Sequence, residues 1–568
     1  MKKNAKNETK NKEAKNKALT GYPSIDRPQE KYYRKTPIRE IETKQRIYDL
    51  IFRSNKENMD APALQYMGKR LSFAEVKELT DAFAEGLVSL GVMEKDVVLV
   101  GLPHCPEAVV SLLAVNRIGA ATKWFDIRAG EQDIAGYINS SKCRYLIITD
   151  ILISKVTEIL QSVCTEKIIV VGQSENSRFI EFSHVMEMKA EKLPEIAFNA
   201  ERPAVMVQSS GTTGTPKTIV HSNISIAASV RKIAYSDLPL GRGTTLLALL
   251  PPWIAYGLGQ SVIMQIALGG SVLLSPSFDP SSLQNNIGEF TTAFAAPFHY
   301  RYVKEHWKEL TESQKGKLHK TECLVSGGDK ISDEENKEME ELFGSVLING
   351  YGSNEAWGVL CVNPAQCNKY GTVGIACYDE TIIAYDNDKE EELKYGEVGE
   401  ICALCNSLFR GYENNEEETA KVKKRHKDGK VWLHTGDLGY IDEEGYVTLL
   451  GRLRRVIVRN AFKIAAATIE NAVCGHPYVK ECVAVEVPDK EEEHAPMAFV
   501  TLSEAASGKA EEEIKAAILQ KCERELKAYE VPKYLEILPE LPYTQNGKYD
   551  FRRLEELGKE KQQSMASL

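Results

Sequence analysis

The sequence contains no long apolar run. Its most apolar stretch, residues 261–275, falls short of the roughly 20 apolar residues that a bilayer-spanning helix needs, and Gly269 and Gly270 interrupt it. The first 22 residues are rich in Lys and Asn and lack the apolar centre of a secretory signal. We therefore expect no membrane span, a cytoplasmic location, and a disordered tail at residues 1–22.

The sequence also lacks a regular cysteine pattern and an excess of basic residues. Its 12 cysteines follow no repeating spacing, and without an export signal reduced thiols are expected. Cys402 and Cys405 form a CxxC pair, but no second pair stands at zinc-site spacing, so we interpret them as residues near a strand. The net charge of −10 argues against a nucleic-acid partner, because nucleic-acid-binding proteins usually present a basic face.

Helix and strand patterns alternate in the first part of the chain. Ser72 and Glu75 form a capping box that begins a helix ending at Gly91, and Pro106 is expected to begin another helix. Short apolar runs that predict buried strands lie at residues 97–100, 145–148 and 167–171. This alternation predicts an α/β fold with βαβ layers and a largely parallel sheet.

The last hundred residues have a different pattern. Strand-like runs at 482–487 and 498–502 precede a charged helix, at 510–529, whose apolar residues recur every four positions. A basic, turn-like stretch at 452–455 separates the two patterns. We therefore expect a large N-terminal domain of several subdomains at residues 23–454 and a small, mobile α+β C-terminal domain at residues 455–568.

The most specific motif is Gln-Ser-Ser-Gly-Thr-Thr-Gly-Thr-Pro-Lys at residues 208–217. Its glycines let the backbone approach a phosphate, its hydroxyls and N–H groups can donate to phosphate oxygens, and Lys217 adds a positive charge. A solvated turn is the alternative interpretation. A Walker A loop starting at Gly211 would need glycine at position 216, where this chain has Pro216, so a P-loop kinase or ATPase is not expected.

Further motifs follow in order. They are Ser-Gly-Gly-Asp-Lys at 326–330, Asn-Gly-Tyr-Gly-Ser-Asn-Glu at 349–355, His-Thr-Gly-Asp at 434–437 and Pro-Tyr-Thr-Gln-Asn-Gly-Lys at 542–548. Alone, the first and third would be common turns. Together with the loop at 208–217, they make the chain resemble the adenylate-forming superfamily from about residue 41 to about residue 554. That superfamily contains acyl-CoA synthetases, nonribosomal adenylation domains and firefly-type luciferases, and the chain is most similar to a fatty-acid–CoA ligase type of acyl-CoA synthetase.

The resemblance implies roles for individual residues. Tyr351 would cover the adenine, and Glu355 would hold Mg²⁺, which prefers oxygen ligands and phosphates. Asp437 would contact the ribose, and Arg452 would contact the ribose or a phosphate. Lys548 would bridge the attacking carboxylate and the α-phosphate. Thr212 and Lys217 are the other implied catalytic residues. The remaining residues implied in nucleotide binding are Ser209, Ser210, Gly211, Thr213, Gly214, Thr215, Gly327, Gly328, Asp329, Asn349, Gly350, Gly352, Ser353 and Asn354.

Three residues depart from the family pattern. Asn354 stands where the family usually has Thr, and its amide would donate to phosphate in place of a hydroxyl. Arg455 occupies the hinge position, which is usually Asp or Lys. Ala461 replaces a glycine that lines the pantetheine tunnel for the thiol.

The resemblance implies ATP-dependent activation of a carboxylic acid to an acyl-adenylate, with ATP and Mg²⁺, and then transfer to a thiol, with coenzyme A expected as the acceptor. Two alternatives stay open: loading onto the phosphopantetheine of an acyl carrier protein, which Ala461 suggests, and an inactive nucleotide-binding relative, which Asn354 and Arg455 suggest. The protein would be a monomer or a homodimer.

The acyl substrate is less well determined. No acidic residue lies between positions 244 and 274, and a buried ammonium without a partner is costly, so a fatty or other organic acid is favoured over an amino acid. Trp253, Tyr256 and Gly257 are candidate acyl-pocket residues, although core packing would explain the two aromatic rings equally well.

Overall fold

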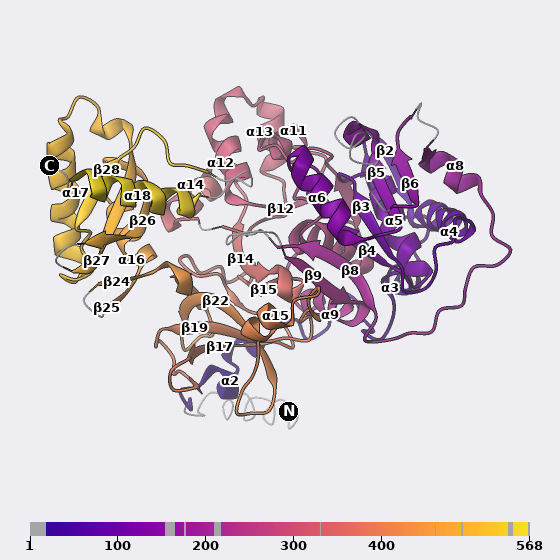
Figure 1. Ribbon diagram of the computed structural model, residues 1–568, viewed down its shortest axis with the longest axis horizontal. Coiled ribbons are helices and arrows are strands. Elements are labelled where there is room, and N and C mark those ends of the chain that lie inside the picture. The colour runs from indigo at the N-terminus through magenta and orange to yellow at the C-terminus, as the bar shows by residue number, and fades with distance from the viewer. Residues whose placement is uncertain are drawn as a thin grey trace, which may run out of the picture.

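The computed structural model describes residues 19–153, 165–174, 178–209, 217–329, 331–459, 462–489, 492–543 and 549–565. Large sheets and their helices form most of the molecule, and a smaller unit of sheet and helix lies at the C-terminal end, at the left of Figure 1. This arrangement confirms the predicted α/β fold with a small α+β C-terminal part. Among the described helices, none is both long enough and apolar enough to cross a membrane.

The first sheet has the strand order β20–β9–β8–β4–β3–β5–β6–β7. Neighbours from β8 to β7 run parallel, whereas β9 pairs antiparallel with β8 and β20. Its strands are β3 (Val97–Gly101), β4 (Ala121–Trp124), β5 (Tyr145–Thr149), β6 (Lys167–Val171), β7 (Phe179–Glu181), β8 (Pro203–Gln208), β9 (Thr218–Ser222) and β20 (Gly411–Tyr412). Helices associated with it are α4 (Phe73–Ser89), α5 (Pro106–Arg117), α6 (Glu131–Ser141) and α8 (Phe182–Glu187). The predicted strands at 97–100, 145–148 and 167–171 are therefore confirmed.

The predicted helix signals in this region are also confirmed. The Ser72 hydroxyl accepts from the Glu75 N–H at 3.2 Å, and the Glu75 carboxylate accepts from the Ser72 N–H, so the capping box is complete. Gly91 has φ +90°, the left-handed conformation that glycine favours after a helix. Helix α5 begins at Pro106, as expected from the favourable first-turn position of proline.

The second sheet has the order β16–β15–β14–β13–β12–β10–β11–β1–β2, with parallel pairing from β1 to β14. Its strands are β1 (Pro62–Tyr66), β2 (Lys69–Ser72), β10 (Thr245–Ala248), β11 (Ser271–Leu274), β12 (Thr292–Ala295), β13 (Cys323–Ser326), β14 (Leu347–Ser353), β15 (Gly358–Val362) and β16 (Ile375–Ala376). Its helices include α11 (Ser281–Asn285), α12 (Pro297–Glu305), α13 (Glu312–Leu318) and α14 (Asp333–Phe343). In open α/β sheets, ligands bind beyond the carboxyl ends of parallel strands. Candidate motifs follow β8, β10 and β13, and another spans the end of β14.

The third sheet is antiparallel, with the order β18–β17–β19–β22–β21 and β23 paired to β22. Its strands are β17 (Thr381–Asp386), β18 (Glu391–Glu392), β19 (Gly399–Leu404), β21 (Lys423–Arg425), β22 (Val431–Ile441) and β23 (Val447–Arg452). The described start of the chain is bonded to this sheet region: the Ser24 N–H of α2 (Pro23–Asp26) donates to Glu392 at 2.9 Å, and the Tyr395 N–H donates to the Gly21 carbonyl at 3.1 Å.

The C-terminal unit has its own apolar cores, separate from those of the large sheets. The hairpin β24–β25 follows η7 (Leu453–Arg455) and leads into a sheet of β26, β27 and β28. The elements are β24 (Val456–Arg459), β25 (Phe462–Ala465), α16 (Ala466–Cys474), β26 (Val479–Asp489), β27 (Glu493–Leu502), α17 (Glu511–Glu525), β28 (Tyr534–Ile537) and α18 (Phe551–Met565). The predicted strands at 482–487 and 498–502 lie within β26 and β27, and α17 is the predicted charged helix.

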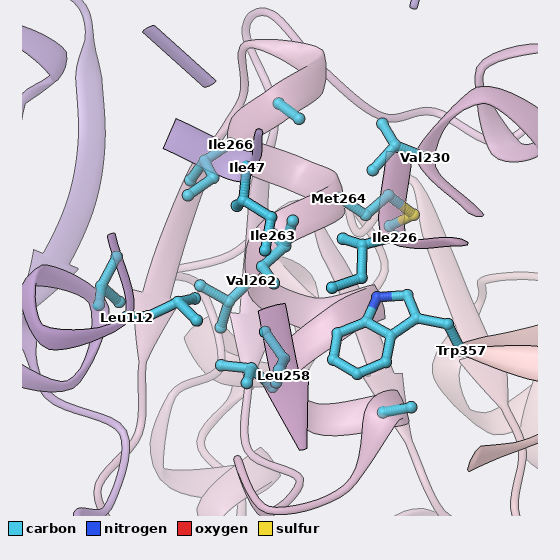
Figure 2. Close-up of a cluster of buried hydrophobic side chains, with 14 of the residues drawn as sticks. Ile47, Leu112, Ile226, Val230, Leu258, Val262, Ile263, Met264, Ile266 and Trp357 are labelled. Carbon is cyan, nitrogen blue, oxygen red and sulfur yellow. The ribbon is translucent and has the colours of Figure 1, made fainter. Parts of the chain in front are cut away.

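The most apolar stretch of the sequence lies at the centre of the molecule. The π-helix η4 (Tyr256–Ile263) continues directly into α10 (Met264–Leu268), and every residue of α10 is buried. Figure 2 shows side chains of this segment among residues from distant parts of the chain, including Ile47 of α3 (Ile47–Ser54), Ile226 of α9 (Asn223–Ala234) and Trp357. A mostly apolar helix is stable when other elements cover it, so here the pattern reflects a protein core.

An ion pair is buried where α9 meets β17. The Lys232 ammonium lies 2.8 Å from a Glu380 carboxylate oxygen and 2.9 Å from the Ser407 hydroxyl. The two charged side chains are 3% and 2% exposed. Removing one charge would leave the other buried without its partner, which is far more costly than losing a surface pair.

We predict that Lys232→Met destabilises the protein by about 3–5 kcal/mol, because Glu380 would be left buried without the ammonium that pairs with its carboxylate. Urea unfolding followed by tryptophan fluorescence measures the shift in midpoint. Arg231→Met is the matched control, since its half-exposed pair with Asp379 is worth about 1 kcal/mol or less. The double variant Lys232→Met with Glu380→Met should recover most of the loss, and a double variant as unstable as Lys232→Met would contradict the explanation.

Candidate functional site

The β8–β9 hairpin presents the glycine-rich motif. Beyond Gln208, the last residue of β8, the Ser209 N–H donates to the Lys217 carbonyl at 2.8 Å and the Lys217 N–H donates to the Ser209 hydroxyl at 2.9 Å. These bonds fix the two points at which the loop joins the hairpin. Predicted site residues that lie outside the described residues are Ser210, Gly211, Thr212, Thr213, Gly214, Thr215, Ala461 and Lys548.

The Lys217 side chain belongs to a charged cluster beside this loop. Its ammonium pairs with Glu418 of α15 (Glu416–Val422) and lies 4.9 Å from the centre of the Tyr412 ring. Hydrogen bonds from Lys217 and Lys421 lower the pKa of Glu418 to about 2. Glu418 is therefore ionised at neutral pH, and it competes with any anion that approaches Lys217.

Tyr412 connects this cluster to the predicted metal ligand. Its hydroxyl donates to a Glu355 carboxylate oxygen at 2.8 Å, and Glu355 lies on η6 (Asn354–Ala356), directly after β14. A carboxylate beside a phosphate-type loop fits the preference of Mg²⁺ for oxygen ligands and phosphates. The sequence analysis missed Tyr412 and Glu418, because neither stands in a recognisable motif. The pairing of β20 with β9 brings Tyr412 to the site.

The nitrogen and the oxygen of the Asn354 side-chain amide both form hydrogen bonds. The nitrogen donates to the Gln208 carbonyl at 3.1 Å, and the oxygen accepts from the Ala255 N–H at 2.9 Å. The backbone carbonyl of Asn354 lies 2.7 Å from Nε2 of His221. Burial lowers the pKa of His221 to about 3, so its ring is neutral and Nε2–H is the donor. One amide hydrogen of Asn354 is thus already used, and its contact with phosphate stays a prediction.

Tyr351, Asp437 and Arg452 come from separate motifs and meet in the structure. The Tyr351 hydroxyl donates to one Asp437 oxygen at 2.5 Å, and the Arg452 Nε–H donates to the other at 2.8 Å. Asp437 and Arg452 face each other across β22 and β23. Burial raises the pKa of Asp437, while the positive charge of Arg452 opposes this shift. The result is a buried carboxylate whose oxygens are arranged to accept from hydroxyl and N–H donors.

The turn after β13 packs against an aromatic ring. A side chain at Gly327 would place its Cβ 3.2 Å from the Tyr256 ring and 3.3 Å from the Gly350 carbonyl, so glycine allows Tyr256 to lie against this turn. Gly328 and an exposed Asp329 follow. The other predicted residues of this region lie along β14: Asn349, Gly350, Gly352 and Ser353.

The candidate acyl-pocket residues lie in and just before the π-helix. Trp253 is 3% exposed, packs edge-on against Phe278 with 5.0 Å between ring centres, and accepts from the Gln208 N–H through its carbonyl at 3.1 Å. Core packing accounts for the Trp253 ring. A Cβ at Gly257 would lie 2.0 Å from the Pro251 carbonyl oxygen, so the chain path at the start of the π-helix requires glycine.

The hinge candidate Arg455 is bonded to the C-terminal unit. Its guanidinium pairs with Glu470 of α16, donates to the Ala484 carbonyl at 3.1 Å and lies 3.9 Å from the centre of the Phe551 ring. The Glu470 carboxylate also accepts from the Ala484 N–H at 2.9 Å. The arginine at this position is thus matched by a glutamate of the C-terminal unit.

Comparison with known proteins gives matches over most of the chain. The family described as AMP-binding enzyme matches residues 51–413, and the family described as AMP-binding enzyme C-terminal domain matches residues 468–548. A long-chain-fatty-acid–CoA ligase of Bacillus subtilis is 29% identical over 87% of this chain and 91% of the relative. A 4-coumarate–CoA ligase of Humulus lupulus is 27% identical over 83% of this chain and 87% of the relative.

The fold is also shared with solved structures. The crystal structure of an anthranilate CoA ligase in complex with anthranoyl-AMP superposes with a TM-score of 0.79 at 21% identity. The match covers 93% of this chain and 99% of that chain. At this level of identity the likeness concerns the fold alone.

We predict that Arg455→Asp loosens the start of the C-terminal unit, because it places a second carboxylate beside Glu470 and removes the donor to Ala484. Losing a hydrogen bond to a charged group costs about 1.5–3 kcal/mol, so amide exchange at Ala484 should become about 10- to 100-fold faster. Hydrogen–deuterium exchange of α16 and β26 peptides measures this. Arg553→Asp, on the surface of α18, is the control, and unchanged exchange in Arg455→Asp would refute the role of the pair.

Proposed function

Because the chain belongs to the AMP-binding enzyme family, we propose that it is an AMP-forming acid–thiol ligase. It activates a carboxylic acid with ATP to an acyl-adenylate, releases pyrophosphate, and transfers the acyl group to coenzyme A. The matches to a fatty-acid–CoA ligase and to a coumarate–CoA ligase over more than four-fifths of the chain support this proposal.

The observation that carries the proposal is that the segment from Tyr351 to Glu355 has two ends with different chemical surroundings. Tyr351 on β14 meets the buried Asp437 carboxylate, which suits a nucleoside. Four residues later, Glu355 meets Tyr412 beside Lys217 and the glycine-rich loop, which suits phosphates. An adenosine and its phosphates could therefore be held at the two ends of this segment.

The proposed first step is attack of the substrate carboxylate on the α-phosphorus of ATP. A carboxylate oxygen bonds to phosphorus, the bond to the bridging oxygen breaks, and pyrophosphate leaves with its electron pair. Lys217 would leave Glu418 to neutralise the phosphates, and Glu355 would hold Mg²⁺, which neutralises further phosphate charge. Lys548 would guide the attacking carboxylate. The protein acts here mainly by positioning and charge neutralisation.

In the second step a thiolate attacks the acyl carbonyl, AMP leaves, and the thiol proton passes to solvent. The small C-terminal unit would reorient between the steps so that one site serves both. Coenzyme A is the proposed acceptor. The alternative acceptor, a carrier-protein phosphopantetheine, rests on Ala461.

The proposed substrate is an organic acid without an ammonium group. The segment of residues 244–274 has no acidic side chain and is mostly buried in the core, so it offers no partner for an ammonium. A fatty or aryl carboxylic acid fits this chemistry. The relatives named above have a long-chain fatty acid and 4-coumarate in their names.

Asn354 and Arg455, the departures that suggest an inactive relative, each have partners in the fold. Asn354 bonds to Gln208 and Ala255, and Arg455 bonds to Glu470, so each unusual residue has a matched set of partners. Both residues are thus accommodated in the fold, and the assay that follows distinguishes an active enzyme from an inactive relative.

A panel of carboxylic acids with MgATP, run with and without coenzyme A, tests the proposal. Pyrophosphate release and the acyl product, identified by mass spectrometry, are the readouts, and acyl-CoA plus AMP from one class of acid is the expected result. Adenylate that passes to a carrier protein but not to coenzyme A would select the carrier alternative. ATP binding without pyrophosphate release from any acid would identify an inactive relative.

We predict that Asp437→Asn raises the KM for ATP about 10- to 100-fold, since it weakens charge-assisted hydrogen bonds worth about 1.5–3 kcal/mol. The kcat should change much less, because Asp437 lies at the nucleoside end. Steady-state kinetics at varied ATP separates the two effects. Asp386→Asn, at the end of β17 in the same sheet, is the control. An unchanged KM in Asp437→Asn would argue against a ribose contact.

A further inference from the structure

A second group of chemically distinctive side chains lies in the third sheet, on β19, β22 and the turn between β21 and β22. Ligand atoms of Cys402, His426 and His434 all lie within 4.8 Å of one another. The Nε2 atoms of the two histidines are 2.8 Å apart. Cys402 and His434 are buried, and His426 is half-buried. None of these groups takes part in the proposed reaction.

The strand pairing explains why these residues meet. Cys402 of β19 and His434 of β22 are direct partners in the antiparallel ladder, and side chains of such partners lie side by side on one face. His426 follows β21, in the hairpin that joins β21 to β22, and its N–H donates to the Lys430 carbonyl at 3.0 Å. Three residues that belong to no common sequence motif thus lie together on one face of the sheet.

The rings at this place are held by apolar packing. The His426 ring stacks on Tyr385, with 4.1 Å between ring centres, and on Trp432, with 5.2 Å between ring centres. Tyr385, Trp432 and Cys402 belong with Ile383 to a small buried apolar cluster. Such a shell limits the access of water and restricts the orientation of the ring.

Glu400 fixes the orientation of the His434 ring through the nitrogen that faces away from His426. Its carboxylate accepts from Nδ1 of His434 at 2.6 Å, which leaves the lone pair of His434 Nε2 directed toward His426. Metal-binding histidines characteristically donate their other ring N–H to a carboxylate in this manner. Glu400 also accepts from Asn387 and from the Gly436 N–H, one residue before Asp437.

We propose that Cys402, His426 and His434 bind one Zn²⁺ ion, with Glu400 as the carboxylate that orients His434. Sulfur and imidazole nitrogen are the ligands that zinc takes in proteins, and tetrahedral bonds of about 2.0–2.3 Å would need ligand atoms roughly 3–4 Å apart. The two Nε2 atoms, which lie 2.8 Å apart, would have to separate by about half an ångström to bind one ion. A fourth position is left for water.

Binding of Zn²⁺ would leave this group of side chains and the ion without net charge. Cys402 loses its thiol proton to solvent, both histidines bind as neutral rings, and His426 carries its proton on Nδ1. The thiolate and the Glu400 carboxylate then offset the two charges of the ion, so the buried group is neutral overall. The ion would tie β19, β22 and the β21–β22 hairpin together behind the Asp437 turn. This inference is independent of the proposed reaction.

The test uses tag-free full-length protein, stripped with chelator and then titrated with Zn²⁺ or Co²⁺. Elemental mass spectrometry should find one zinc per chain, and the cobalt form should show tetrahedral visible bands with a thiolate-to-cobalt charge-transfer band. Zinc should also raise the melting temperature. Glu400→Gln should weaken the affinity for zinc about 10- to 100-fold.

Two variants and a matched control complete the design. Cys402→Ser should remove the charge-transfer band, and His426→Gln, at a half-buried position where folding is less at risk, should abolish stoichiometric binding. Cys405→Ser, three residues from Cys402 and outside the group, should bind zinc as the unaltered protein does. The proposal would be overturned if the reconstituted unaltered protein bound no zinc, or if His426→Gln bound zinc equally well. The two histidines would then be a hydrogen-bonded pair.

Discussion

The geometry of the candidate site depends on the junction at Asn354. The Asn354 side-chain amide bonds to Gln208 at the end of β8, in the first sheet, and to Ala255, which lies just before the π-helix η4. The carbonyl of the same residue accepts from the neutral His221 ring of β9. Because a buried polar group without its partner costs about 1–3 kcal/mol, each of these bonds resists displacement of one sheet against the other. The ends of β8 and β14 therefore keep a fixed relation.

The charged side chains around this junction are held by internal partners. Lys217 has Glu418, and Asp437 has Arg452 and Tyr351. Side chains that are already ordered lose less conformational entropy when a ligand binds. Such pairs therefore favour a site that holds its ligand in one position over a site that changes shape around it. A ligand that enters must exchange these contacts for its own, which favours molecules that carry both hydroxyl donors and negative charge.

Local signals in the sequence predicted much of the fold. The Ser72–Glu75 capping box, the helix start at Pro106 and the apolar runs at β3, β5 and β6 depend on neighbouring residues, and all are present. The resemblance to a known family named Tyr351, Asp437 and Arg452 as nucleotide-site residues, and the structure shows that their side chains bond to one another.

The remaining parts of the site depend on contacts between distant segments. Tyr412 reaches Glu355 only through the pairing of β20 with β9, and no local pattern encodes that pairing. The CxxC spacing likewise gave no guide to the partners of Cys402, because its neighbour in the ladder is His434, 32 positions later. Arg452 and Arg455, three residues apart, are anchored in opposite directions, one to Asp437 and the other to Glu470. If the C-terminal unit reorients as proposed, the short backbone segment between these two anchored side chains is where the turn would occur.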